Sequence, residues 1–161
     1  MDFVIALLLF IFTVVVYFSY TNNFQTEDQG EINSMLSDAK AISSSLTLSG
    51  YPSSWDNTTV IRIGIADDQR INTTKLKNFK QLNYSLTKKK FGTVYDYFVF
   101  FVGNNGSIIN ITDVCGVGSP LINAACTPVN LTGINKQKLV KTERYLNYNS
   151  QVMKMVVYVW Q

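Results

Sequence analysis

The sequence contains no histidine, only two cysteines and few charged residues. Of its 161 residues, 16% are charged, and the formal net charge is +3. Without histidine, the chain lacks the commonest general base and the commonest metal ligand of proteins. Two cysteines are too few to hold a zinc finger or an iron–sulfur cluster alone. We therefore expect a protein that is not an enzyme and that carries no cofactor or metal.

Catalytic motifs are missing as well. The sequence has no G-x-S-x-G, no phosphate-binding loop and no H-E-x-x-H. Asp67 and Asp68 form a carboxylate pair that fits a turn after a strand. With Asp113 they are candidate calcium ligands, although their spacing is not that of an EF-hand.

One long apolar run lies near the start of the chain. Residues 3–20 read FVIALLLFIFTVVVYFSY, with only Thr13 and Ser19 as polar interruptions. As a helix, these 18 residues span about 27 Å, close to the thickness of a bilayer core. The run is apolar on every side, which predicts a membrane segment or the core of a helix bundle. It lacks the basic region and the cleavage site of a secretory signal, so we expect a basic leader before Met1 in the precursor.

Asp2 directly precedes this run. A carboxylate at the start of an apolar helix is costly in lipid, and the helix dipole offsets only part of that cost. The free amino terminus of a neighbouring chain would be a better partner. Alternatively, Asp2 is a solvated acid at the membrane surface.

The helix is predicted to continue as an amphipathic element to Leu48. Its apolar positions follow helical spacing and form one stripe: Phe24, Ile32, Met35, Leu36, Ala39, Ile42 and Leu46. Gly50 and Pro52 then supply a stop signal. We predict an N-terminal stem helix over residues 1–48 and a head domain over residues 49–161.

The head shows strand-like patterns. Val60–Ile65 alternates, with Ile61, Ile63 and Ile65 on one face. A helix capped by Thr73 or Thr74 is predicted to end near Gly92.

Two hairpins are predicted further along the chain. The first joins Tyr95–Val102 to Ser107–Thr112, and the second joins Leu139–Leu146 to Val152–Trp160. The predicted fold class is α+β, a long helix that is first hydrophobic and then amphipathic, packed on a mostly antiparallel β-sheet head.

Cys115 and Cys126 enclose ten residues rich in Gly, Ser and Pro. A disulfide would stabilise so short a loop by about 2–3 kcal/mol in the chain-entropy model. In an exported chain we favour this disulfide over two free thiols.

The head also carries an excess of Asn-X-Ser/Thr sequons. With 15 asparagines and 27 serines and threonines in 161 residues, chance predicts about 2.5 sequons. Six occur, at Asn57, Asn72, Asn83, Asn105, Asn110 and Asn130. We interpret them as candidate N-glycosylation sites on an extracellular head.

Charge divides along the chain. Residues 1–48 contain five acidic residues and one basic residue, a net −4, whereas residues 49–161 contain six acidic and thirteen basic residues, a net +7. The basic residues of the head are scattered apart from Lys88–Lys90, which favours a solvated surface over a nucleic-acid partner. Contacts between acidic stems and basic heads of different subunits are an alternative.

Together these features resemble a type IV pilin, most closely the archaeal kind. The resemblance rests on Asp2-Phe3, the uninterrupted apolar run, its amphipathic continuation to Leu48 and the small β-rich head. It implies a precursor cut by a prepilin peptidase, which waits in the membrane and then polymerises through the apolar helix with the help of assembly machinery. Asp2 would set the register of incoming subunits.

The resemblance implies a structural subunit of an extracellular pilus that adheres to surfaces or to other cells. Its assembly contacts would come from the helix residues Asp2, Phe3, Leu7, Phe10, Val14 and Phe18. Two other functions remain open. One is a single-pass membrane protein whose extracellular head binds a partner, and the other is a minor pilin-like subunit of a secretion or DNA-uptake apparatus.

Overall fold

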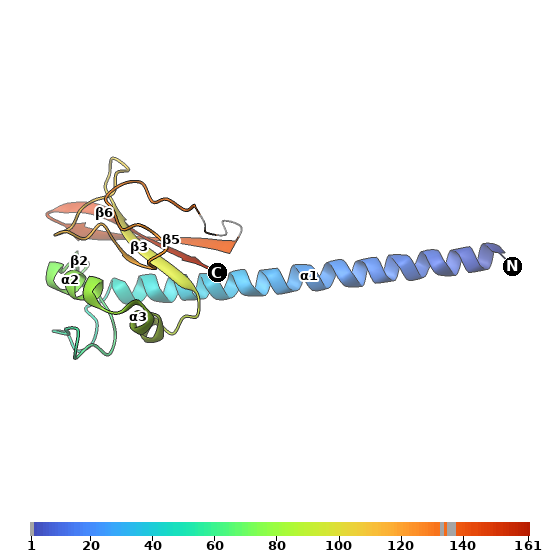
Figure 1. The fold of residues 1–161 in the computed structure, drawn as a ribbon, viewed down its shortest axis with the longest axis horizontal. Helices are drawn as coiled ribbons and strands as arrows, with labels where there is room; N and C mark the ends of the chain where they lie inside the picture. Colours follow the sequence, from blue (N-terminus) through green and yellow to red (C-terminus); the bar gives the residue numbers. More distant parts are fainter. Residues whose placement is uncertain (1, 133, 135–137) are drawn as a thin grey trace. The chain divides into compact units, whose positions relative to one another are not determined.

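The structure, a computed structural model, describes residues 2–132, 134 and 138–161 (Figure 1). The chain divides into two compact units, Met1–Ser34 and Met35–Gln161. Helix α1 (Asp2–Leu46) supplies the first unit and the beginning of the second. The remaining elements belong to the second unit: β1 (Ala66–Asp67), β2 (Arg70–Ile71), α2 (Thr73–Gln81), α3 (Tyr84–Phe91), β3 (Asp96–Val102), β4 (Gly116–Gly118), β5 (Leu139–Tyr148) and β6 (Gln151–Trp160).

Within the described residues, six strands form one curled sheet in the order β1-β2-β5-β6-β3-β4. Strand β2 runs parallel to β5, and the other neighbouring strands are antiparallel. The predicted α+β class is confirmed, but the sheet is mixed.

The β5–β6 hairpin is the longest pairing and confirms the hairpin predicted from the sequence. Its register runs from Leu139 opposite Trp160 to Tyr148 opposite Gln151. The two turn residues, Asn149 and Ser150, both have positive φ, at 48° and 62°. This backbone conformation matches the twist of the flanking strands, and Asn tolerates it better than most residues.

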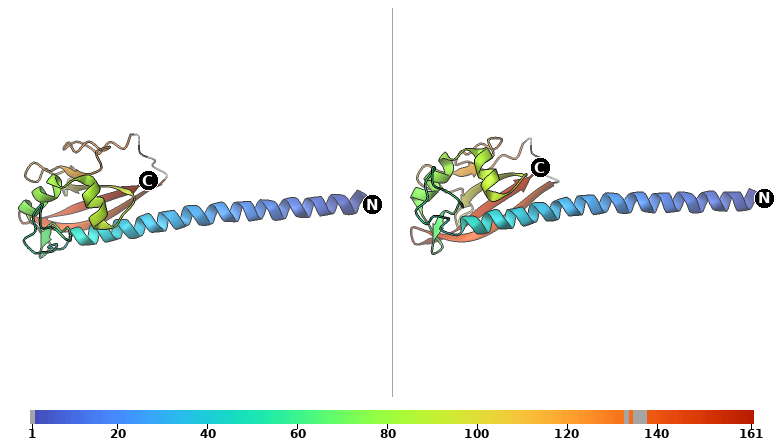
Figure 2. Two further views of the ribbon diagram at one scale, coloured as in Figure 1. Left: turned by 60° about the horizontal axis from the view of Figure 1, so that its bottom comes forward. Right: turned by 90° about the horizontal axis from the view of Figure 1, so that it is seen from below.

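One face of the sheet packs against the helices. From α1 this core receives Met35, Ala39, Ile42 and Leu46, all fully buried. Alternate strand positions face them, including Tyr97, Val99 and Phe101 of β3 and Met153, Met155, Val157 and Val159 of β6. Figure 2 shows α2 and α3 on the same side of the sheet. From Met35 onward the predicted stripe is therefore buried except for Leu36, which is half-buried. Ile32 is 41% exposed, and the side chain of Phe24 lies outside the described part.

The opposite face of the sheet is also apolar, which the sequence analysis missed. Phe98, Phe100, Val156 and Trp160 form a second buried cluster with Ile122. Parts of the segment between β4 and β5 pack on it through Val129, Leu131 and Ile134. The predicted disulfide joins Cys115 to Cys126 in this region, with Cα atoms 5.0 Å apart. Because both faces are covered, β3 is buried at five consecutive positions rather than at alternate ones.

Residues 60–65 do not form the predicted strand. Only Arg62 makes a β-bridge there, to Tyr51, and Ile61 is 65% exposed while Ile63 and Ile65 are buried. The segment instead supplies hydrogen-bond donors to carbonyl groups at the end of α1. The N–H groups of Ile65 and Ala66 donate to the carbonyls of Leu46 and Leu48 at 3.0 and 3.2 Å. Gly64 permits this approach, since a Cβ atom there would lie 2.3 Å from the Leu48 oxygen.

The single helix predicted between Thr73 and Gly92 is two helices. Asn72, rather than Thr73 or Thr74, caps α2, and Leu82 leaves the helix in an extended conformation. The side chain of Asn83 then accepts hydrogen bonds from the N–H groups of Ser85 and Leu86 and starts α3.

The hairpin predicted for β3 is also wrong in its partner. Residues 107–112 make only isolated bridges, such as Val102 with Ile108. The neighbours of β3 are β6 and β4 instead. Its apolar sequence from Tyr97 to Val102 favours a central position in the sheet, and the long β6 strand supplies more pairing than residues 107–112.

Candidate assembly segment and surface sites

The apolar part of α1 is exposed along its whole length. Asp2–Tyr20 is long enough and apolar enough to cross a membrane, and it is the one such helix among the described residues. Fourteen large hydrophobic side chains between Phe3 and Tyr20 are each at least 46% exposed. By length and composition this segment can serve as a membrane anchor or as a signal sequence.

The exposure is costly in water. Burying one such side chain contributes about 1.5–3 kcal/mol. For fourteen of them the total is on the order of 20–40 kcal/mol. Covering Asp2–Tyr20 with lipid or with other apolar helices would therefore be strongly favourable.

The six residues predicted to make assembly contacts all lie on this segment. Their spacing of three or four places Phe3, Leu7, Phe10, Val14 and Phe18 along one side of the helix. Phe3 is 80% exposed and Val14 is half-buried. Asp2 is exposed in the first helical turn, where a carboxylate interacts favourably with the helix dipole.

Thr13 shows how the segment accommodates a polar group. Its hydroxyl donates to the carbonyl oxygen of Leu9 at 2.6 Å, one helical turn earlier. A threonine satisfied within its own helix can enter an apolar environment without leaving a hydrogen-bonding group unpaired. The side chain is therefore compatible with lipid and with a helix bundle.

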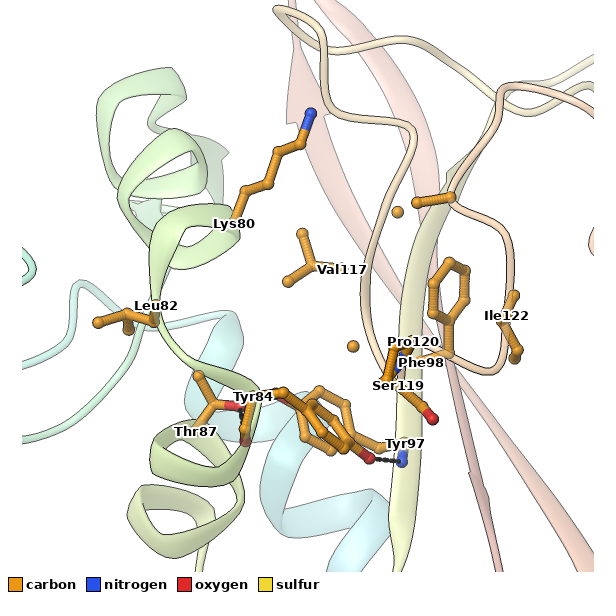
Figure 3. A pocket seen from close by; sticks show the side chains of 13 residues that line it. Lys80, Leu82, Tyr84, Thr87, Tyr97, Phe98, Val117, Ser119, Pro120 and Ile122 are labelled. Carbon is orange, nitrogen blue, oxygen red and sulfur yellow. Dashed lines mark hydrogen bonds between the residues drawn. The ribbon is translucent and has the colours of Figure 1, made fainter.

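A cleft of about 190 Å³ opens between the α2–α3 segment and strands β3 and β4 (Figure 3). The rings of Tyr84, Tyr97 and Phe98 line it together with Ser119 and Lys80. None of its lining residues, all within the described part of the chain, is a carboxylate or a cysteine. Its polar side chains are one lysine and four hydroxyl groups, those of Tyr84, Thr87, Tyr97 and Ser119.

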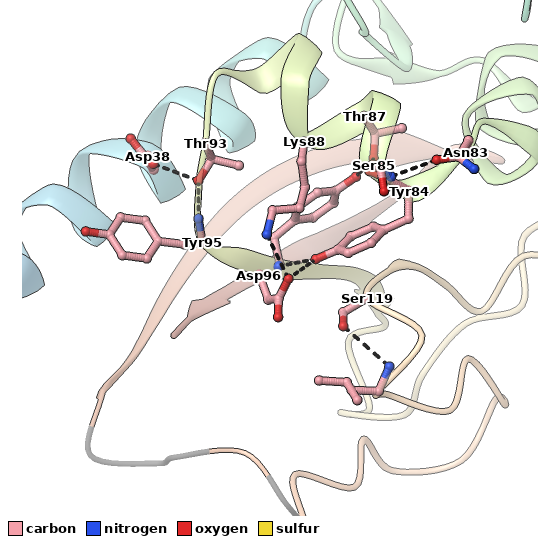
Figure 4. Close-up of polar contacts among 12 residues, drawn as sticks. Asp38, Asn83, Tyr84, Ser85, Thr87, Lys88, Thr93, Tyr95, Asp96 and Ser119 are labelled. Carbon is pink, nitrogen blue, oxygen red and sulfur yellow. Dashed lines mark hydrogen bonds and ion pairs between the residues drawn. The ribbon is translucent and has the colours of Figure 1, made fainter.

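Polar contacts beside the cleft join α3 to β3 (Figure 4). The Tyr84 hydroxyl donates to Asp96 Oδ1 at 2.7 Å and accepts from the Tyr97 N–H at 3.2 Å. Lys88 Nζ lies 3.0 Å from the same carboxylate oxygen. Burial, followed by the hydrogen bond to Asp96, raises the pKa of Tyr84. The phenol therefore stays protonated and anchors the helix to the strand.

Lys75 and Asp67 form the most buried ion pair among the described residues. Lys75 Nζ lies 2.5 Å from Asp67 Oδ1, and the lysine side chain is only 7% exposed. The hydrogen bond from Lys75 lowers the pKa of Asp67. The carboxylate of Asp67 is thus paired with a lysine. Among the described residues, no three His, Cys, Asp or Glu side chains gather to hold a metal ion.

The sequon asparagines lie in different environments. Asn57, Asn83, Asn105, Asn110 and Asn130 are exposed, whereas Asn72 is half-buried and its Nδ2 donates to Asp67 at 2.9 Å. Asn72 and Asn83 also cap helices through their side-chain oxygens. The sequence analysis placed one cap at Thr73 or Thr74 and missed both asparagines, although Asn is a preferred residue at the start of a helix.

Comparisons with protein-family models, with curated proteins and with solved structures found no match to this chain.

Proposed function

We propose that this chain is the structural subunit of an extracellular filament of the type IV pilus kind, most like the archaeal ones. One observation carries the proposal. Residues 3–20 of α1 are apolar on all sides and exposed, while Met35–Gln161 forms a compact unit with its own core. Such a segment is stable in lipid and at the centre of a helix bundle. Polymerisation transfers it from one to the other without passage through water.

The head supports the extracellular part of the proposal. A disulfide is stable in oxidising compartments, and the Cys115–Cys126 bond fastens the segment that covers the outer face of the sheet. Five of the six sequon asparagines are exposed, as N-glycosylation requires. In the filament, the stems would form the centre and the heads the surface that contacts substrates or other cells.

Asp2 would set the register of assembly. A neighbouring amino terminus would neutralise its carboxylate in the apolar bundle, where an unpaired charge is costly. Asp2→Ala should leave membrane insertion intact and strongly reduce the yield of filaments sheared from cells. Asp2→Glu, which keeps the carboxylate, is the matched control and should retain most of the yield. Equal filament yields from all three chains would show that Asp2 has no such role.

A membrane-anchored extracellular binding protein is the second candidate. The same exposed helix would then be a permanent anchor, and the cleft beside Tyr84 would be available to a ligand. Cell fractionation separates the two functions. A filament subunit is recovered in the sheared extracellular fraction, whereas an anchored protein remains with the membranes.

A further inference from the structure

The basic residues of the head look scattered in the sequence, but the structure places six of its lysines on two consecutive helices. Residues 70–95 contain Arg70 and six lysines but no acidic residue. All six lysines belong to α2 and α3, which we call the basic helix pair. The two helices follow each other on the same side of the sheet (Figure 2). This region therefore carries seven of the thirteen positive charges of residues 49–161.

The head neutralises only part of this charge. Lys75 pairs with Asp67 at 2.5 Å, and Lys88 pairs with Asp96 at 3.0 Å. Lys80 and Lys90 donate to backbone carbonyls, those of Asp113 and Val60. A carbonyl satisfies hydrogen bonds but supplies no negative charge.

Two further lysines, Lys77 of α2 and Lys89 of α3, are exposed. No carboxylate among the described residues lies within 4.0 Å of the amino groups of Lys77, Lys80, Lys89 or Lys90. The basic helix pair thus presents four positive charges that have no carboxylate partner among the described residues.

The chain contains the complementary charge in a different place. Glu27, Asp28 and Glu31 lie within five residues on α1, and no basic residue precedes Lys40. We call residues 27–31 the acidic segment. In sequence it follows the apolar segment that would form the filament centre and precedes the stripe buried in the head.

We propose that the basic helix pair binds the acidic segment of a second copy of this chain. This inference rests on the proposed filament function and adds a second, electrostatic interface to the apolar one. A second copy is favoured over an anionic membrane because every subunit brings one basic helix pair and one acidic segment, with four unpaired lysines opposite three carboxylates. Individual exposed ion pairs contribute little, but they repeat along a polymer and fix which neighbours align.

Salt provides the first test and needs no variant. Exposed ion pairs are screened when the Debye length falls from about 10 Å at 0.1 M salt to about 3 Å at 1 M. In a mild detergent that covers the apolar helix of a released subunit, sheared wild-type filaments should therefore release more subunits at 1 M than at 0.1 M NaCl, by about tenfold, when sedimented at equal concentration. Equal release at both salt concentrations would overturn the inference.

Charge exchange provides the second test. Lys77→Glu with Lys89→Glu should reduce filament yield, and Glu27→Lys with Glu31→Lys should do the same. The chain carrying all four changes should recover most of the yield, because the charges are complementary again. Lys154→Glu, on the sheet face opposite the helices, changes charge equally per residue and should leave the yield unchanged.

The remaining outcomes are decisive as well. Thermal unfolding of each variant shows whether its head is folded. If a variant head is misfolded, the salt test on the wild-type filaments decides whether the electrostatic interface exists. A fourfold variant no better than the double variants would contradict the inference. A second contradicting result is a Lys77/Lys89 variant that forms unchanged filaments but binds more weakly to vesicles containing phosphatidylglycerol. That result would assign the helix pair to lipid. If the wild-type chain forms no filaments at all, the proposed function itself fails.

Discussion

The two ends of α1 use apolar residues in opposite ways. Between Phe3 and Tyr20 the side chains are apolar all round and exposed. Between Met35 and Leu46 apolar side chains occupy one stripe, and four of its five members are fully buried. Polar residues such as Asp38 and Ser44 take the other positions, and Asp38 accepts a hydrogen bond from Thr93 at 2.7 Å (Figure 4).

The two ends of α1 therefore serve different processes, the folding of the head at one end and assembly with lipid or other chains at the other. The stripe at Met35–Leu46 completes the core of the head, so the rest of the chain already supplies its partners. The segment at 3–20 has no such partners in the described structure and must find them in lipid or in other chains. Substitutions in the two halves should therefore affect different measurements.

The largest effect on folding is expected at the buried stripe. Ile42→Ala removes three carbons from a fully buried side chain and should lower the unfolding free energy of the head by about 2–5 kcal/mol. The matched change Ile11→Ala, at a half-exposed position of the apolar segment, should leave head unfolding unchanged. Urea unfolding of the full chain in detergent, followed by tryptophan fluorescence, measures both. Equal losses of unfolding free energy in the two variants would show that the apolar segment contributes to head folding as much as the buried stripe does.

The converse experiment places a charge in the apolar segment. Leu9→Lys lies near its middle and should disfavour membrane insertion by about 2.5–3.5 kcal/mol. Head unfolding should stay the same. A carbonate-extraction assay on cell membranes measures insertion, and Lys40→Ala, which removes an exposed charge on the same helix, serves as the control. Full insertion of Leu9→Lys would argue against a membrane stage.

The disulfide sharpens the comparison within the head. Replacing Cys115 and Cys126 by serine should lower the unfolding free energy by about 2–3 kcal/mol, because the unfolded chain regains the freedom of the loop. The effect should centre on the outer sheet face, where Ile122 packs, and hydrogen exchange would locate it. Increased exchange in the β5–β6 pairing instead would indicate a different role.

The smallest effect concerns acid sensitivity. Lys75 lowers the pKa of Asp67, so the stabilisation from this pair is present above the ordinary pKa of 3.8 and is lost as pH falls through the lowered value. Asp67→Asn should cost about 1–2 kcal/mol at pH 7, reduced by the partial exposure of the carboxylate. The variant should also lose less stability than the wild type between pH 5 and pH 2, roughly the range of carboxylate protonation. Parallel acid titrations would contradict this.

Sequence periodicity predicted the elements that have strong internal signals. The apolar run, the β5–β6 hairpin and the Cys115–Cys126 pair follow from residue patterns alone. Val60–Ile65 has an alternating pattern, yet the N–H groups of Ile65 and of the next residue, Ala66, donate to carbonyls at the end of α1, a demand that arises only in the folded chain. The cover on the outer sheet face was equally invisible, because Ile122, Val129 and Ile134 are scattered in a segment without periodicity.

The candidate site was predictable only in part. Composition identified the apolar segment, because its apolar character on all sides follows from its sequence. The contacts of Tyr84 with Asp96, and of Lys75 with Asp67, join residues eight to twelve positions apart through a helix and a strand or turn. No local pattern encodes such pairs, so the division of lysines into paired and unpaired ones required the structure.

The most direct test of the account is a helical reconstruction by cryo-electron microscopy of filaments sheared from cells that express this chain. The account predicts a polymer of this chain with residues 3–20 bundled at the axis and the β-sheet heads outside. It also predicts additional density on exposed sequon asparagines such as Asn105. Filaments built from another protein, with this chain retained in the membrane fraction, would contradict the central claim and favour the anchored binding protein.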